Sequence, residues 1–148
     1  MYKHILIPVD GSALAAAGLE QGLGLARALG ASVTVLTVYS PFQTISMETV
    51  QLEGVRTEYE RHARDLAQSY LSDAAKRAEA AGVPCTTEMR ESSNPYQAIV
   101  DLAMTQGCDL IAMASHGRRG MAAVVLGSQT QKVLAHSATP VLVYRKPR

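Results

Sequence analysis

Cysteine is scarce in this sequence, and charge of one sign does not dominate it. Only Cys85 and Cys108 are present, they form no C-x-x-C pair, and the four histidines show no metal-ligand spacing. We therefore expect neither a disulfide framework nor a structural zinc site, and both cysteines are most simply small buried hydrophobic residues. The formal net charge of +1 gives no general attraction to nucleic acid or to an acidic membrane, so any anion site must be local.

Long hydrophobic runs are also missing. No segment approaches the roughly 18 consecutive apolar residues of a membrane span, and the start, MYKHILIPVD, lacks a long apolar core behind a basic flank. We therefore expect no membrane span, no signal peptide and a cytoplasmic location. The 148 residues, 47% of them hydrophobic and 18% charged, fit one globular domain over 1–148 with a core of its own.

What the sequence does contain is an alternation of short apolar runs with helix-like segments. The expected strands are HILIPV (4–9), SVTVLTVY (32–39), VPCTTEM (83–89), DLIAMAS (109–115) and PVLVYR (140–145). The expected helices cover 12–30, 47–81, 95–106 and 129–137. Because parallel neighbours need crossover connections, this alternation predicts an α/β fold, a single-domain five-stranded parallel sheet with helices on both faces.

Several residues within the expected helices have a structural interpretation. Gly22 and Gly24 suggest a dinucleotide-binding motif, but Arg27 stands where its third glycine would be needed, so we interpret both as helix-packing glycines. Along the long helix, apolar residues recur at helical spacing. We expect these residues, Tyr59 and Tyr70 among them, to face the core.

Two strand ends carry the residues that point to a ligand. In open α/β sheets, ligands bind beyond the carboxyl ends of the strands, where the strand order reverses. The first strand is followed by DGS (10–12), and the fourth by SHG (115–117), a basic loop, and GS (127–128) opening a helix. Glycines let backbone amides approach an anion, and the first amides of a helix have no partner within it. This arrangement predicts phosphate binding, although the lysine of a P-loop is missing.

Four segments spread over the whole chain carry a family resemblance. They read ILIPVDGS, VTVLTVYSP, LIAMASHGRRG and LGSQTQKVLAHSATPVLVYR. Together they resemble the universal stress proteins, whose nucleotide loop has the form G-x-x-G, nine residues, G-[ST]. Here the loop runs from Ala114 to Gly117 and, after nine residues, reaches Gly127 and Ser128. Ala114 replaces the usual first glycine, while the other positions keep the spacing.

The resemblance implies strand order 3-2-1-4-5 and a site for ATP or AMP, with or without magnesium, at the ends of strands one and four. Residues 8–10 and Val38 would hold the base, with Asp10 accepting a hydrogen bond from the adenine edge. Met113 and Ala114 would flank the ribose, and amides of the loop would hold the phosphates. The implied binding residues are Pro8, Val9, Asp10, Val38, Met113, Ala114, Gly117, Gly127, Ser128 and Gln129.

Interpretations of the same residues that involve no ligand stay open. The DGS segment at 10–12 could be only a turn and a helix cap, which is what such residues do most often. His116 is most simply a polar loop residue, since no nucleophile or carboxylate stands at a recognisable catalytic spacing. Arg118 and Arg119 could meet phosphate oxygens or could equally be a solvated pair.

Three functions remain open at this level. The leading one is a stress-response regulatory protein that senses or sequesters an adenine nucleotide, with at most slow ATP hydrolysis, because no catalytic base is recognisable. The alternative is a dimeric scaffold of the same fold that holds no nucleotide and acts through protein partners, for which Ala114 is the best argument. An adenylating ligase is disfavoured, since an S-G-G-x-D-S loop is missing.

The last expected strand predicts a homodimer. By its position in the chain, PVLVYR (140–145) should lie at an edge of the sheet, and its charged residues, Arg145 and then Lys146, come only after the apolar segment. Antiparallel pairing of this strand with its copy would satisfy the exposed backbone groups and bury Val141 and Val143. The family resemblance implies the same interface.

Overall fold

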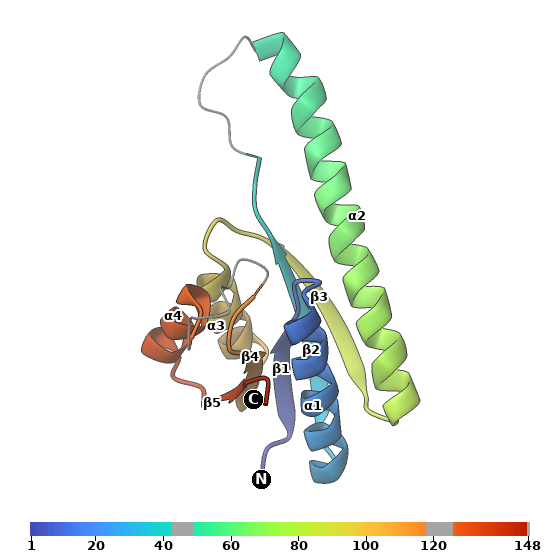
Figure 1. The fold of residues 1–148 in the computed structure, drawn as a ribbon, viewed down its shortest axis with the longest axis vertical. Helices are drawn as coiled ribbons and strands as arrows, with labels where there is room; N and C mark the ends of the chain where they lie inside the picture. The colour runs from blue at the N-terminus through green and yellow to red at the C-terminus, as the bar shows by residue number, and fades with distance from the viewer. Residues whose placement is uncertain (43–48, 118–125, 148) are drawn as a thin grey trace.

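The computed structural model describes residues 1–42, 49–117 and 126–147, with the backbone alone for 49–52. The described residues form one parallel sheet of five strands in the order β3-β2-β1-β4-β5, as predicted (Figure 1). The strands are β1 (His4–Pro8), β2 (Ser32–Tyr39), β3 (Cys85–Glu91), β4 (Leu110–Ala114) and β5 (Val141–Tyr144).

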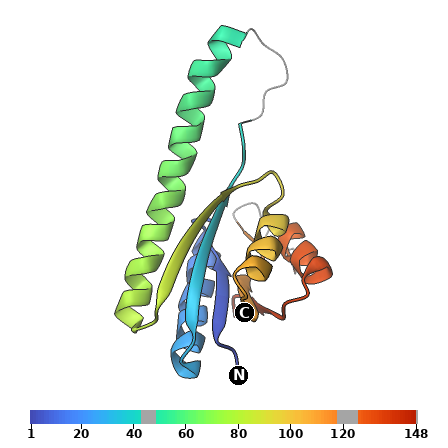
Figure 2. The same cartoon turned by 180° about the vertical axis from the view of Figure 1, so that it is seen from behind.

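Four helices cover the two faces of this sheet. They are α1 (Ala13–Leu29), α2 (Thr49–Ala81), α3 (Pro95–Thr105) and α4 (Ser128–His136). Helices α1 and α2 lie on one face, and α3 and α4 lie on the other (Figures 1 and 2). The expected bounds agree within two residues, except that the start of the long helix, near Met47, falls outside the described residues. None of the helices described is both long and apolar enough to cross a membrane.

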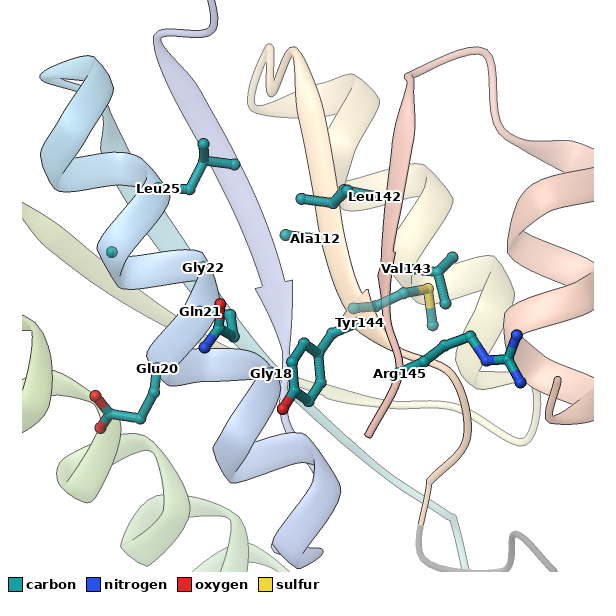
Figure 3. Close-up of a pocket in the computed structure, with 12 residues that line it drawn as sticks. Gly18, Glu20, Gln21, Gly22, Leu25, Ala112, Leu142, Val143, Tyr144 and Arg145 are labelled. Carbon is teal, nitrogen blue, oxygen red and sulfur yellow. The ribbon is translucent and has the colours of Figure 1, made fainter. Parts of the chain in front are cut away.

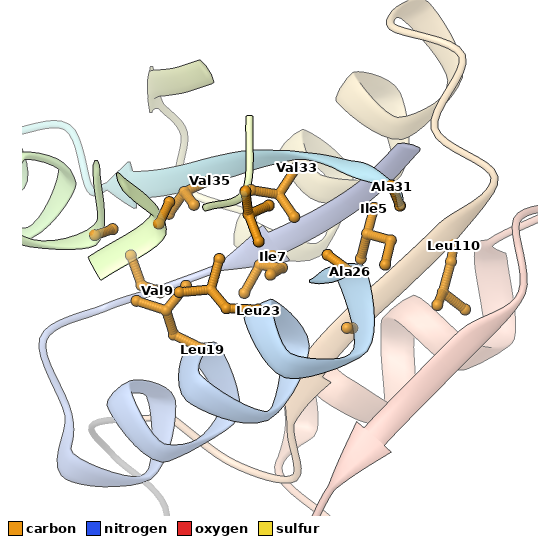
Figure 4. Close-up of a cluster of buried hydrophobic side chains, with 14 of the residues drawn as sticks. Ile5, Ile7, Val9, Leu19, Leu23, Ala26, Ala31, Val33, Val35 and Leu110 are labelled. Atoms are coloured by element: carbon orange, nitrogen blue, oxygen red, sulfur yellow. The ribbon is translucent and has the colours of Figure 1, made fainter. Parts of the chain in front are cut away.

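Successive strand residues alternate between two hydrophobic clusters, one on each face of the sheet. In β1, Ile5 and Ile7 pack toward α1 and α2, whereas Leu6 packs toward α3 and α4. Figure 4 shows the first cluster, with Leu19 and Leu23 of α1 against the sheet. Branched apolar side chains on both faces are what a parallel sheet covered on both sides requires.

The two cysteines are placed largely as expected. Cys108 is buried in the cluster toward α3, whereas Cys85 is half-buried. Burial, together with the neighbouring Asp109 carboxylate, raises the pKa of the Cys108 thiol to about 11. Cys108 therefore acts as a small hydrophobic residue at neutral pH.

Helix α1 begins and ends at residues that the sequence indicates. The Oγ atom of Ser12 accepts a hydrogen bond from the Ala15 N–H at 3.1 Å, and Gly30 ends the helix in the left-handed region at φ 67°. A Cβ on Gly22 would lie 2.7 Å from Ile7 Cδ1, so Gly22 does let the helix approach the sheet. Gly24 does not, because no heavy atom of the described residues lies within 4 Å of a Cβ built there. The interpretation of Gly24 as a packing glycine was wrong.

Gly24→Ala is expected to raise the free energy of unfolding by about 1 kcal/mol, because glycine in an exposed helical position costs about that much relative to alanine. Chemical denaturation would measure the change. Gly22→Ala is the matched control on the same helix. We expect the close contact of its added Cβ with Ile7 to offset the stability gained from the higher helix propensity of alanine. Equal stabilisation by both substitutions would contradict the distinction between the two positions.

Helix α2 projects beyond the end of the sheet (Figure 1). Its 33 residues span about 50 Å, roughly twice the length of the strands beside it. The sheet therefore does not reach the first turns, where Val55 is 57% and Tyr59 39% exposed. The expectation that Tyr59 faces the core was wrong, whereas Tyr70 does pack against the core cluster.

Strand β5 is an edge strand that pairs with β4 alone. Val141 and Val143 are half-buried, and Val141 packs against the cluster toward α3 and α4. Leu142 lies on the opposite face and is 49% exposed. It borders a groove of about 530 Å³ between β5 and α1, where Gly18 and other small residues of the helix leave space (Figure 3).

Candidate functional site

A cleft of about 880 Å³ opens at the carboxyl edge of the sheet. Strand β1 lies between β2 and β4 at this edge, and the chain leaves β1 toward β2 on one side while β4 and β5 extend the sheet on the other. This is the point where the strand order reverses and where ligands of open α/β sheets bind. All ten residues implied by the sequence line this cleft: Pro8, Val9, Asp10, Val38, Met113, Ala114, Gly117, Gly127, Ser128 and Gln129.

Asp10 lines the cleft just after β1. Its Oδ1 atom accepts a hydrogen bond from the Ser12 N–H at 3.0 Å, so the segment is a turn as well as a helix start. Gly11 between them has φ +82°, and a Cβ there would collide with the Tyr70 ring. A Cβ on Gly117 would collide with Asp10 Oδ2. The glycines thus let the carboxylate sit between the ends of β1 and β4 while it keeps its role in the turn.

The start of α4 brings backbone amides to the cleft. Gly127 precedes the first turn of α4, and the Gln131 N–H already binds the Gly127 carbonyl. Helix geometry leaves the N–H groups of Ser128 and Gln129 without a carbonyl partner inside the helix. They lie where the positive end of the helix dipole meets the cleft, which suits an anion.

One detail of the predicted loop is corrected. The Gly127 N–H donates to the Ser115 carbonyl at 2.7 Å, so this amide links the start of α4 to the residue after β4 and is not directed at a ligand. The smallness of Gly127 still matters, because a Cβ there would lie 3.0 Å from both Cα and Cβ of His116. Arg118 and Arg119, expected near phosphate or in solvent, lie outside the described residues.

Ala114, which replaces the usual first glycine of the loop, is only 8% exposed. Its carbonyl accepts a hydrogen bond from Thr130 Oγ1 at 3.1 Å, which ties the end of β4 to α4. A Cβ built on Gly18 of α1 would lie 3.7 Å from the Ala114 methyl group. The methyl group is therefore directed toward α1, where a glycine makes room for it.

Ala114→Gly is accordingly expected to leave the affinity for ATP within about threefold of the parent, because the methyl group packs on α1. The substitution is expected to destabilise the fold by about 1 kcal/mol, through lost packing and added backbone freedom. Calorimetric titration and chemical denaturation measure the two effects. Affinity that tightens by more than tenfold would show instead that the methyl group crowds the ligand.

Sequence reasoning missed the contributions of α2 and α3 to the cleft. Tyr59, His62 and Tyr70 line it from α2, and Pro95 and Ile99 line it from α3. The helical spacing of the apolar residues in α2 indicates one continuous face, but it does not show that part of that face meets a cleft. His116 also lines the cleft, with its Nδ1 atom 3.3 Å from Ser115 Oγ.

The cleft thus combines apolar walls, a central carboxylate and a helix N-terminus, a set that suits a flat ligand with a hydrogen-bond donor and an anionic tail. Within the described part of the chain, no group of three histidine, cysteine or acidic side chains could hold a metal ion. The model of the universal stress protein family matches residues 1–145. The chain belongs to this family.

Individual universal stress proteins are similar to this chain in both sequence and fold. Universal stress protein MJ0531 of Methanocaldococcus jannaschii is 32% identical over 150 residues, which cover all of this chain and 85% of the relative. The solved structure of MJ0577 superposes with a TM-score of 0.83 at 28% identity, covering 100% of this chain and 99% of that one. A universal stress protein solved in complex with cAMP has a TM-score of 0.69 at 25% identity, with 97% of each chain covered.

Proposed function

We propose that this universal stress protein binds an adenine nucleotide, ATP or AMP, in the cleft and serves as a nucleotide-dependent regulator of the stress response. The observation that carries the proposal is that residues from four separate segments, implied one by one from the sequence, line a single cleft. The similar protein solved with cAMP supports an adenine ligand. Family membership supports the regulatory role.

Each part of the ligand has a matching part of the cleft. The base fits between Pro8 and Val38, on the α3 side of the sheet edge, where Asp10 can accept from its exocyclic amine. The phosphates fit at α4, where the Ser128 hydroxyl and the amides of Ser128 and Gln129 can donate to their oxygens. Magnesium would arrive with the phosphates, which it prefers as ligands.

We propose binding, with at most slow hydrolysis, as the primary activity. Hydrolysis of ATP needs a water molecule that is positioned and activated in line with the terminal phosphate. His116 and Asp10 both line the cleft near the end of β4, and Asp10 already accepts a hydrogen bond from the Ser12 N–H. Ala114 is the best argument for the scaffold alternative, and the position of its methyl group against α1 favours the nucleotide proposal instead.

We further propose that the protein is a homodimer joined along β5. The outer edge of β5 presents backbone groups that β4 does not use, and Leu142 is exposed beside the groove along α1 (Figure 3). Antiparallel pairing of two such edges around a twofold axis satisfies these groups and brings the two Leu142 side chains together.

Mass spectrometry of the ligand released from purified, denatured protein tests the nucleotide proposal. We expect an adenine nucleotide near one equivalent per chain. A protein that carries no nucleotide after purification, and that also takes none up when incubated with ATP or AMP, would contradict it.

A further inference from the structure

Residues from both faces of the sheet line the cleft, and the fit proposed for the base uses Pro8 and Val38 on the α3 side. In β2, Leu36 and Val38 belong to the side of α3, so the alternation of a strand places Thr37 and Tyr39 on the side of α2. We call the part on this second face the α2-side chamber. It is lined by Thr37, Tyr39, Tyr59, Ala63, Leu66 and Tyr70.

Ala63 of α2 lines this chamber with a small side chain. It is half-buried, whereas Ala67, one turn farther along the helix, is buried with 1% of its surface exposed. A larger side chain at position 63 would therefore enter the chamber. The chamber is therefore a consequence of the side chains that this sequence carries, and not only of the backbone.

The walls of the chamber suit a flat and largely apolar group. The Tyr59 hydroxyl donates to the Ser40 carbonyl at 3.0 Å, and its ring lies 5.5 Å from the Phe42 ring, so both its polar end and its orientation are held. Tyr39 and Tyr70 add two more rings, and Leu66 adds an aliphatic surface. Aromatic rings pack well against such walls, in stacked or edge-to-face arrangements.

Asp10 connects the two sides of the cleft. It follows β1 at the sheet edge, and the neighbouring Gly11 lies against the Tyr70 ring, which belongs to the chamber. A base on the α3 side that offers its exocyclic amine to Asp10 directs that amine toward the chamber. A group attached to this nitrogen would cross the sheet edge and enter the chamber, while the second amine hydrogen still binds Asp10.

We propose that the α2-side chamber binds a flat, mainly apolar ring. The ring is carried on the exocyclic amine of the bound adenine nucleotide or is brought by a separate small aromatic molecule. The first source rests on the proposed function, whereas the second does not.

Calorimetric titration with N6-benzyl-ATP, ATP and 4-methylphenol tests the chamber and separates the two sources. If the nucleotide carries the ring, N6-benzyl-ATP binds at least as tightly as ATP. If a separate molecule brings it, 4-methylphenol binds with saturation in the presence or absence of ATP.

Ala63→Phe places a ring in the chamber from within the protein. We expect it to weaken the binding of N6-benzyl-ATP, or of 4-methylphenol, by about tenfold or more, while ATP stays within about threefold. Ala80→Phe is the matched control, since Ala80 is an exposed residue of the same helix outside the cleft and bears the same loss of helix propensity. Tyr59→Ala is a second variant for the case that Ala63→Phe is unfolded in thermal melts. It removes a wall of the chamber at a partly exposed position, and we expect it to weaken the binding of the ring-bearing ligand by several-fold.

The outcomes keep this proposal apart from the proposed function. If ATP binds but N6-benzyl-ATP binds more than about thirtyfold more weakly, and 4-methylphenol does not bind, the chamber proposal is overturned and the nucleotide site stands. If neither nucleotide binds, the proposed function fails, and the binding of 4-methylphenol alone tests the chamber proposal. Ring binding that survives Ala63→Phe and Tyr59→Ala unchanged also overturns it, because the ring then lies elsewhere.

Discussion

Gly127→Val is expected to abolish detectable ATP binding, with a loss of about a hundredfold or more, while the protein stays folded. A Cβ at this position lies 3.0 Å from Cα and Cβ of His116 and 3.4 Å from the Ser115 carbonyl oxygen, and valine adds two methyl groups to it. The backbone φ of −67° suits valine, so the effect is steric. Ser115 and His116 must then separate from the start of α4, which displaces the amides of Ser128 and Gln129 from the proposed phosphate position.

Calorimetric titration with ATP measures this loss, and circular dichroism with a thermal melt verifies the fold. Gly24→Val is the matched control, because the same side chain enters open space at a position of α1 that does not line the cleft. It should lose stability through helix propensity and keep parental affinity. Parental affinity in Gly127→Val would show that the phosphates bind elsewhere.

The second large effect concerns assembly. The parent protein is expected to be a dimer, and Val141→Lys combined with Val143→Lys is expected to yield monomers, because each dimer would bring four lysines to one strand pair. Light scattering across a dilution series measures the mass.

Because Val141 and Val143 are half-buried within one chain, the double substitution could also weaken the fold. Leu142→Lys avoids this, since Leu142 is 49% exposed and its replacement costs one chain little. It should raise the protein concentration at which half of the chains are dimeric by about tenfold or more. A parent that is monomeric at high concentration would contradict the β5 interface, as would Leu142→Lys protein that associates as the parent does.

Much of the fold could be predicted because its signals are local. The run from Ser32 to Tyr39 is branched and apolar, and the structure places β2 at these residues. Ser12 and Gly30 bound α1 through a hydrogen bond and a left-handed backbone that depend on their own chemistry. Strand order came from family resemblance, since periodicity does not specify which strands are neighbours.

The parts that could not be predicted depend on distances between elements. The spacing of Val55 and Tyr59 is helical, but their exposure follows from where the sheet ends, which the spacing does not contain. Gly22 and Gly24 look alike in sequence, yet only Gly22 faces the sheet, because two residues along a helix turn the side chain by about 200°.

The site divides in the same way. Its loop residues could be assigned to the cleft because glycine and serine at a helix start have a recognisable chemistry, and Asp10 could be assigned to it because it directly follows a buried strand. The chamber under α2 could not, since Ala63 and Tyr39 come together only after the long crossover packs on the sheet. The partner of the Gly127 N–H likewise depends on how the start of α4 packs on Ser115.

Titration of the ligand-free parent protein with ATP, and in parallel with GTP, tests the central claim most directly. The account predicts saturable binding of one ATP per chain. It also predicts binding of GTP that is weaker by about tenfold or more, since guanine presents a carbonyl oxygen where adenine presents the amine that would donate a hydrogen bond to Asp10. Folded protein that shows no saturable binding of ATP would contradict the account.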